Sequence, residues 1–156
     1  MHTEVADFVA HLLHSSTVTH QMHWSTDSYA KHKALKKYYT GIVDLADAYA
    51  EAWMGKYEEQ LTQFPAEFHN AKEPIAYLKG VKQFVVDARE HLPDDSELQN
   101  IIDEIAKLIN DTIFKLKFLS GGDPCTVKVT RHLCPRALPT VRRTATRSLC
   151  PRAMAT

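Results

Sequence analysis

The chain has 156 residues, of which 44% are hydrophobic and 24% are charged, and its formal net charge is zero. This length predicts one domain with a real hydrophobic core. No apolar run approaches a membrane span, and the first residues lack the charged-then-apolar pattern of a secretory signal. We therefore expect a cytoplasmic protein, or a host-cytoplasmic one if it is viral, without membrane contact.

The zero net charge hides a sharp asymmetry. Residues 1–123 carry 12 lysines and arginines against 19 acidic residues, whereas residues 124–156 carry seven basic residues and no acidic one. All three cysteines lie in this basic segment, where a Leu-Cys-Pro-Arg-Ala stretch occurs twice, and an odd number gives no disulfide framework. We predict a folded domain over 1–122 and an irregular basic tail over 123–156, in which several prolines forbid a long helix.

Apolar residues recur every three or four positions along the first 120 residues, which is typical of amphipathic helices. We predict helices over about 2–26, 28–63, 74–92 and 96–119. Pro74 is predicted to occupy the first turn of the third helix, and Ser96 with Gln99 to form a capping box for the fourth. No strand pattern precedes residue 123. The fold class is therefore all-α, a four-helix bundle.

Two histidines and two carboxylates stand out within this pattern: His23, His32, Asp47 and Glu51. Asp47 and Glu51 are four residues apart, so they share one face of a helix. Mixed imidazole and carboxylate sets suit a first-row metal ion, with Fe(II) or Zn(II) the natural candidates. The group is a candidate metal site because of its spacing, since none of the four residues means much alone.

The helical phase separates this group into two halves. Asp47 and Glu51 each follow a residue of the apolar stripe by two positions, which turns them about 200° away from the core. His23 instead extends the apolar stripe of the first helix. A site using all four residues is easiest to assemble at a two-fold interface between two subunits.

The stretch His23-Trp24, then His32, then Asp47-Ala-Tyr-Ala-Glu51 resembles the motif of the Dps family, the mini-ferritins. The intervals of fifteen residues from His32 to Asp47 and four to Glu51 match that motif, and residues 112–119 resemble the family's final helix. The resemblance covers roughly residues 5–120, although only the stretch 20–55 is specific.

By this resemblance the fold is ferritin-like. His23 and His32 of one subunit would face Asp47 and Glu51 of a two-fold mate. Together these catalytic residues and ligands would bind iron and oxidise Fe(II) with peroxide or dioxygen, and zinc could substitute for iron. The ferric product would be stored in a hollow homo-oligomeric shell, usually of twelve subunits. The resemblance also implies non-specific DNA binding through a basic arm, here the tail, by salt-sensitive phosphate contacts. The alternative, which we favour, is that the tail is a disordered or non-native extension without this role.

Several features leave alternatives open. The nine residues from His23 to His32 are fewer than in the family, and about eleven residues link the second and third predicted helices. Such a link is marginal for a crossover along the bundle, so a simple up-down-up-down order is the alternative topology. The alternative function is a non-enzymatic structural or interaction bundle. His20 is a further candidate ligand, whereas Asp44, like the pair His11 and His14, favours an ordinary structural role.

Overall fold

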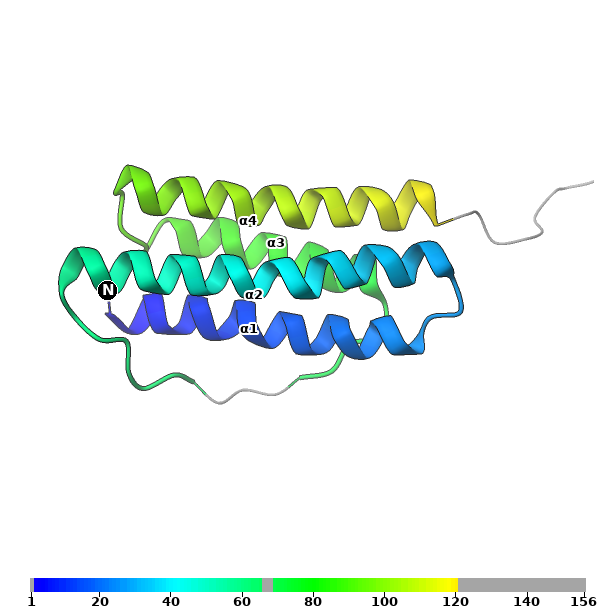
Figure 1. The fold of residues 1–156 in the computed structure, drawn as a ribbon, viewed down its shortest axis with the longest axis horizontal. Coiled ribbons are helices and arrows are strands. Elements are labelled where there is room, and N and C mark those ends of the chain that lie inside the picture. Colours follow the sequence, from blue (N-terminus) through cyan, green and yellow to red (C-terminus); the bar gives the residue numbers. More distant parts are fainter. Residues whose placement is uncertain (1, 66–68, 121–156) are drawn as a thin grey trace, which may run out of the picture. The chain divides into compact units, whose positions relative to one another are not determined.

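The fold is described from a computed structural model, which describes residues 2–65 and 69–120. It contains four α-helices and a final π-helical turn, and no strand occurs among the described residues. The elements are α1 (His2–Ser25), α2 (Tyr29–Tyr57), α3 (Pro74–Arg89), α4 (Ser96–Phe114) and the turn Lys115–Leu119 (Figure 1). The prediction of an all-α four-helix bundle is confirmed. The predicted tail over 123–156, with its proposed DNA contact, lies outside the described residues.

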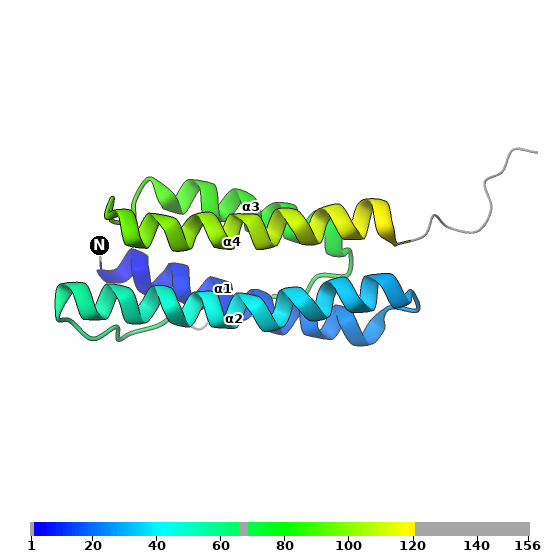
Figure 2. The same ribbon diagram turned by 45° about the horizontal axis from the view of Figure 1, so that its top comes forward.

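Contacts between the helices fix their order. The end of α1 lies beside the start of α2, the end of α2 beside the start of α4, and the end of α3 beside the start of α4. Each of these pairs is therefore antiparallel, so α2 and α3 run in the same direction (Figures 1 and 2). Because successive parallel helices require a connection along the bundle, the simple up-down-up-down alternative is wrong.

The crossover fits because α2 ends six residues before the predicted limit of residue 63. Its last residue is Tyr57, and Glu58 follows in the left-handed conformation with φ of 55°. Residues 58–73 are then available, and sixteen extended residues span about 53–58 Å. The 29 residues of α2 are about 44 Å long, so this link is long enough to return along the helix.

The helix starts test the predicted caps. Pro74 does begin α3, and the Glu73 side chain accepts a hydrogen bond from the backbone N–H of Ala76 at 2.6 Å. The capping box predicted for α4 is wrong, because Asp95 occupies the cap position and Ser96 is already helical. Gln99 instead donates its side-chain amide to the carbonyl of Pro93 at 2.7 Å, so it anchors the preceding loop. The third helix also ends at residue 89 rather than 92.

Side-chain interactions hold the end of α2 against the start of α4. Lys56 forms ion pairs with Asp95 at 2.9 Å and with Glu97, and the Tyr57 hydroxyl donates to the Asp95 carboxylate. The hydrogen bond from Tyr57, reinforced by the charge of Lys56, lowers the pKa of the Asp95 carboxyl. The positive charge of Lys56 is therefore balanced by acidic residues of its own chain.

The core between the helices is apolar, with two tyrosines that differ in their hydrogen bonding. The Tyr38 hydroxyl bonds with Ser15 Oγ at 2.8 Å, whereas the Tyr49 hydroxyl is buried without a partner among the described residues. Burial raises the pKa of both phenols, so both are neutral at pH 7. None of the described helices is long and apolar enough to cross a membrane.

Because the two hydroxyls differ in this way, replacing each tyrosine with phenylalanine should affect the free energy of unfolding differently. Tyr38→Phe removes a hydrogen bond and should lower the free energy of unfolding by about 1 kcal/mol. Tyr49→Phe removes a buried hydroxyl that has no partner, and should leave the free energy of unfolding unchanged or raise it by about 1 kcal/mol. Urea unfolding followed by circular dichroism checks both. A larger loss for Tyr49→Phe than for Tyr38→Phe would contradict this description of the core.

Candidate metal half-site

His23 and His32 are brought together by the short turn between α1 and α2. Only residues 26–28 separate the two helices, and the Ser28 side chain caps α2 by accepting a hydrogen bond from the Lys31 backbone N–H. The two imidazole rings stack with their centroids 3.6 Å apart and their planes 28° apart. His23 is 6% exposed, and His32 is partly buried. The pair is therefore held in the wall of the bundle.

Each histidine bonds to the backbone of the other. His23 Nδ1 lies 2.8 Å from the carbonyl oxygen of His32, and His32 Nδ1 lies 3.0 Å from the carbonyl oxygen of His23. A carbonyl oxygen only accepts, so both Nδ1 atoms carry hydrogen. In a neutral imidazole the Nε2 atom then has a free lone pair. Among the described residues neither Nε2 atom has a hydrogen-bond partner, so neither nitrogen is engaged in a bond within the chain.

This arrangement is the one that metal-binding histidines use. Such residues donate the second ring nitrogen to a carbonyl or carboxylate, which fixes the tautomer and the ring orientation. The nine-residue interval from His23 to His32 contains a tight turn. This turn brings each imidazole ring to the backbone carbonyl of the other histidine. The pair is therefore a candidate half-site, in which each ring could offer its Nε2 atom.

Asp47 and Glu51 lie elsewhere on the same chain. Both are exposed on α2, as the helical phase predicts, and neither has an ion pair among the described residues. The fifteen residues from His32 to Asp47 correspond to about 22 Å along a helix. No group of three or more histidine, cysteine or acidic side chains in the described part of the chain could hold a metal ion. One chain therefore keeps the imidazoles and the carboxylates apart.

A second layer of aromatic residues surrounds the histidine pair. His20 stacks on Tyr39 with ring centroids 3.9 Å apart and lies 4.2 Å from the Trp24 ring. The His20 ring is 5.8 Å from that of His23, so it borders the half-site. Trp24 is 69% exposed, which makes it a surface residue beside the site rather than part of the core. No feature of the sequence indicates that Tyr39 lies beside this pair.

A separate histidine group joins the crossover to α1. His14 Nε2 accepts a hydrogen bond from the backbone N–H of His69 at 3.1 Å, and His69 Nε2 lies 3.2 Å from the Tyr77 hydroxyl. His11 stacks on Phe84 of α3 with centroids 3.8 Å apart. The sequence did not indicate His69, because nothing local shows that the crossover passes over α1. These bonds give His11 and His14 a structural role.

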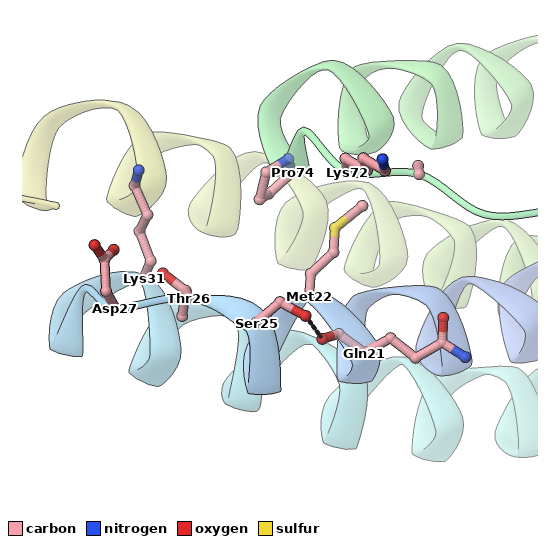
Figure 3. A pocket seen from close by; sticks show the side chains of 9 residues that line it. Gln21, Met22, Ser25, Thr26, Asp27, Lys31, Lys72 and Pro74 are labelled. Atoms are coloured by element: carbon pink, nitrogen blue, oxygen red, sulfur yellow. Dashed lines mark hydrogen bonds between the residues drawn. The ribbon is translucent and has the colours of Figure 1, made fainter.

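A pocket of about 530 Å³ lies next to the half-site but does not include it. Residues of the α1–α2 turn and of the start of α3 line it, with the side chains of Met22, Lys31 and Pro74 around its opening (Figure 3). Among the lining residues, the Ser25 hydroxyl donates to the Gln21 backbone carbonyl at 2.9 Å (Figure 3). Neither histidine of the pair lines this pocket, so it is not the metal half-site.

The fold and the site define an all-α bundle with a stacked pair of buried and half-buried imidazoles between α1 and α2. Residues 23–116 match the model of a family of unknown function, DUF5856, and the chain belongs to that family. The matched stretch begins at His23 and contains all four candidate ligands. No curated protein and no solved structure matches the chain.

Proposed function

We propose that this protein is a Dps-like, ferritin-like iron protein that binds and oxidises Fe(II) between two subunits. The observation that carries the proposal is the reciprocal bonding of His23 and His32 through their Nδ1 atoms, which leaves both Nε2 atoms without a hydrogen-bond partner among the described residues. Neutral imidazoles suit Fe(II), and exposed carboxylates such as Asp47 and Glu51 suit the harder Fe(III) product. Zn(II) is expected to compete for the same nitrogens.

The order of the helices also supports the proposal. Ferritin-like bundles contain one long crossover, which distinguishes them from simple up-and-down bundles. Here the crossover joins α2 to α3 over residues 58–73, and the candidate ligands lie on α1 and α2. The proposed site is therefore made by the hairpin that precedes the crossover, as the resemblance implies.

The chemistry divides between the two half-sites. The imidazoles hold Fe(II), and each iron ion gives up one electron as it is oxidised. Two Fe(II) ions reduce one hydrogen peroxide to two waters with the uptake of two protons, or reduce one dioxygen to hydrogen peroxide with the uptake of two protons. Asp47 and Glu51 of the second subunit stabilise the higher charge of Fe(III). Iron is the substrate in this scheme, and storage of the ferric product requires a closed shell of subunits.

The direct test compares Fe(II) oxidation by the wild-type chain and by the double variant Asp47→Ala/Glu51→Ala. We expect the rate of the variant to fall by roughly tenfold or more, because the oxygen ligands are lost. Glu104→Ala is the matched control, since Glu104 is an exposed acidic residue of α4, away from this face of α2. Absorbance of the ferric product measures all three rates. Equal rates in the wild type and the double variant would contradict the proposal and favour the non-enzymatic bundle.

Light scattering tests the storage part of the proposal separately. A ferritin-like shell, of twelve subunits in the Dps family, has many times the mass of the 17.7 kDa chain. A monomer or an isolated dimer would contradict storage, whereas oxidation at a two-fold interface would need only the dimer.

A further inference from the structure

The outward face of α2 separates its charges into two blocks. The first half carries only lysines and the second half only acidic residues, since no acidic residue occurs between positions 28 and 43 and no lysine between 38 and 55. All of these side chains are exposed, and at 100° per residue they fall on one side of the helix. The lysine block is Lys33, Lys36 and Lys37, and the acidic block is Asp44, Asp47 and Glu51.

These charges have no counter-charge within the described chain. The ion pairs there involve Lys56 and Arg89 rather than either block. Pairing along the helix itself is excluded by distance, because the seven residues from Lys37 to Asp44 separate them by about 10 Å of helix axis, beyond the three- or four-residue spacing that lets side chains meet.

Exposed apolar side chains lie on the same side of the bundle. Val43 of α2 is 39% exposed and lies between the two charge blocks. At the end of α1, Trp24 is 69% exposed, and its ring lies 4.2 Å from that of His20, which stacks on Tyr39 of α2. Apolar surface bordered by charge is the composition of a protein interface.

We propose that this face binds a second copy of the chain, with the two α2 helices antiparallel about a two-fold axis near Gly41 and Ile42. An antiparallel arrangement brings each lysine block against the acidic block of the other copy, whereas a parallel one would oppose like charges. The same patch then serves both subunits, as a closed two-fold dimer requires. The occupant is thus a second copy, because the face is complementary to itself.

The register of this pairing has a consequence for the metal site. Residues equally far from the axis face each other, so Lys36 lies opposite Asp47 of the second copy and His32 lies opposite Glu51. Asp47 then lies one helical turn before Glu51, about 6 Å from it along the axis of α2. The inference deepens the proposed function, on which the identity of the metal rests. The pairing itself rests on the charge blocks and the exposed apolar side chains.

Charge reversal tests the pairing without iron. Lys36→Glu/Lys37→Glu leaves Lys33 as the one basic residue of the two blocks, and Asp44→Lys/Asp47→Lys leaves Glu51 as the one acidic residue. In sedimentation velocity each variant alone should self-associate about tenfold or more weakly than the wild type, because like charges then oppose each other. An equimolar mixture of the two variants should associate again as a heterodimer. Lys79→Glu/Lys82→Glu is the matched control, because it changes the same net charge on the exposed surface of α3.

The mixture makes the result independent of folding defects in either variant, because two misfolded chains would not restore each other. Association of the mixture together with weak self-association of each variant supports the pairing, even if the wild type oxidises no iron, in which case only the proposed function fails. The inference is overturned if the wild type is monomeric, if both variants associate like the wild type and the control, or if the mixture stays monomeric.

Discussion

Replacing His32 with alanine is expected to slow Fe(II) oxidation by roughly 100-fold or more. The change removes one of two nitrogen ligands and also frees the His23 carbonyl that accepts its Nδ1 hydrogen. Loss of an outer partner alone costs metal sites about 10–100-fold, so loss of a ligand that is also a partner should cost at least that. Stopped-flow absorbance of the ferric product measures the rate, and Co(II) titration measures binding without oxidation.

His20→Ala is the control for this experiment. His20 lies beside the pair and stacks on Tyr39, but its ring contacts are with aromatic groups. Its substitution should change the oxidation rate by about twofold at most, because surface packing changes are usually small. Comparable losses in His20→Ala and His32→Ala would show a general disturbance of the surface rather than loss of a ligand. A wild-type rate in His32→Ala would contradict the half-site.

The helices could be predicted because their signals are local. Apolar residues at three- and four-residue spacing placed the four helices, and Pro74 marked the start of α3. The end of α2 could not be predicted, because Glu58 adopts the left-handed conformation without being a glycine. Because α2 ends at Tyr57, the link to α3 has sixteen residues and can run along the bundle, whereas the eleven-residue link expected from the sequence is marginal for such a crossover.

The candidate site was only partly predictable for a related reason. The helical period correctly indicated that Asp47 and Glu51 point away from the core. The bonds between His23 and His32 depend on how closely two backbones approach across a turn, which residue spacing does not specify. The same holds for His69, whose contact with His14 depends on the path of the crossover. The helical period of the sequence therefore predicts which residues share a helix face. The packing of the helices and loops determines which side chains and carbonyls those residues contact.

In the proposed metal site the imidazoles come from one chain and the carboxylates from another. Two inactive variants test it: His23→Ala/His32→Ala lacks the nitrogen half-site, and Asp47→Ala/Glu51→Ala lacks the oxygen half-site. A mixed dimer has two sites, and one of them lacks both the imidazoles and the carboxylates. The other site is intact, because the variant without carboxylates supplies its imidazoles and the variant without imidazoles supplies its carboxylates.

Fe(II) oxidation by the two variants co-expressed in equal amounts is therefore the most direct measurement. Random pairing makes half of the dimers mixed, each with one intact site of two, so the mixture should regain about a quarter of the wild-type rate. Each variant expressed alone should remain at the background rate. A mixture that oxidises Fe(II) no faster than its two components, in assemblies shown to contain both chains, would contradict a site shared between subunits.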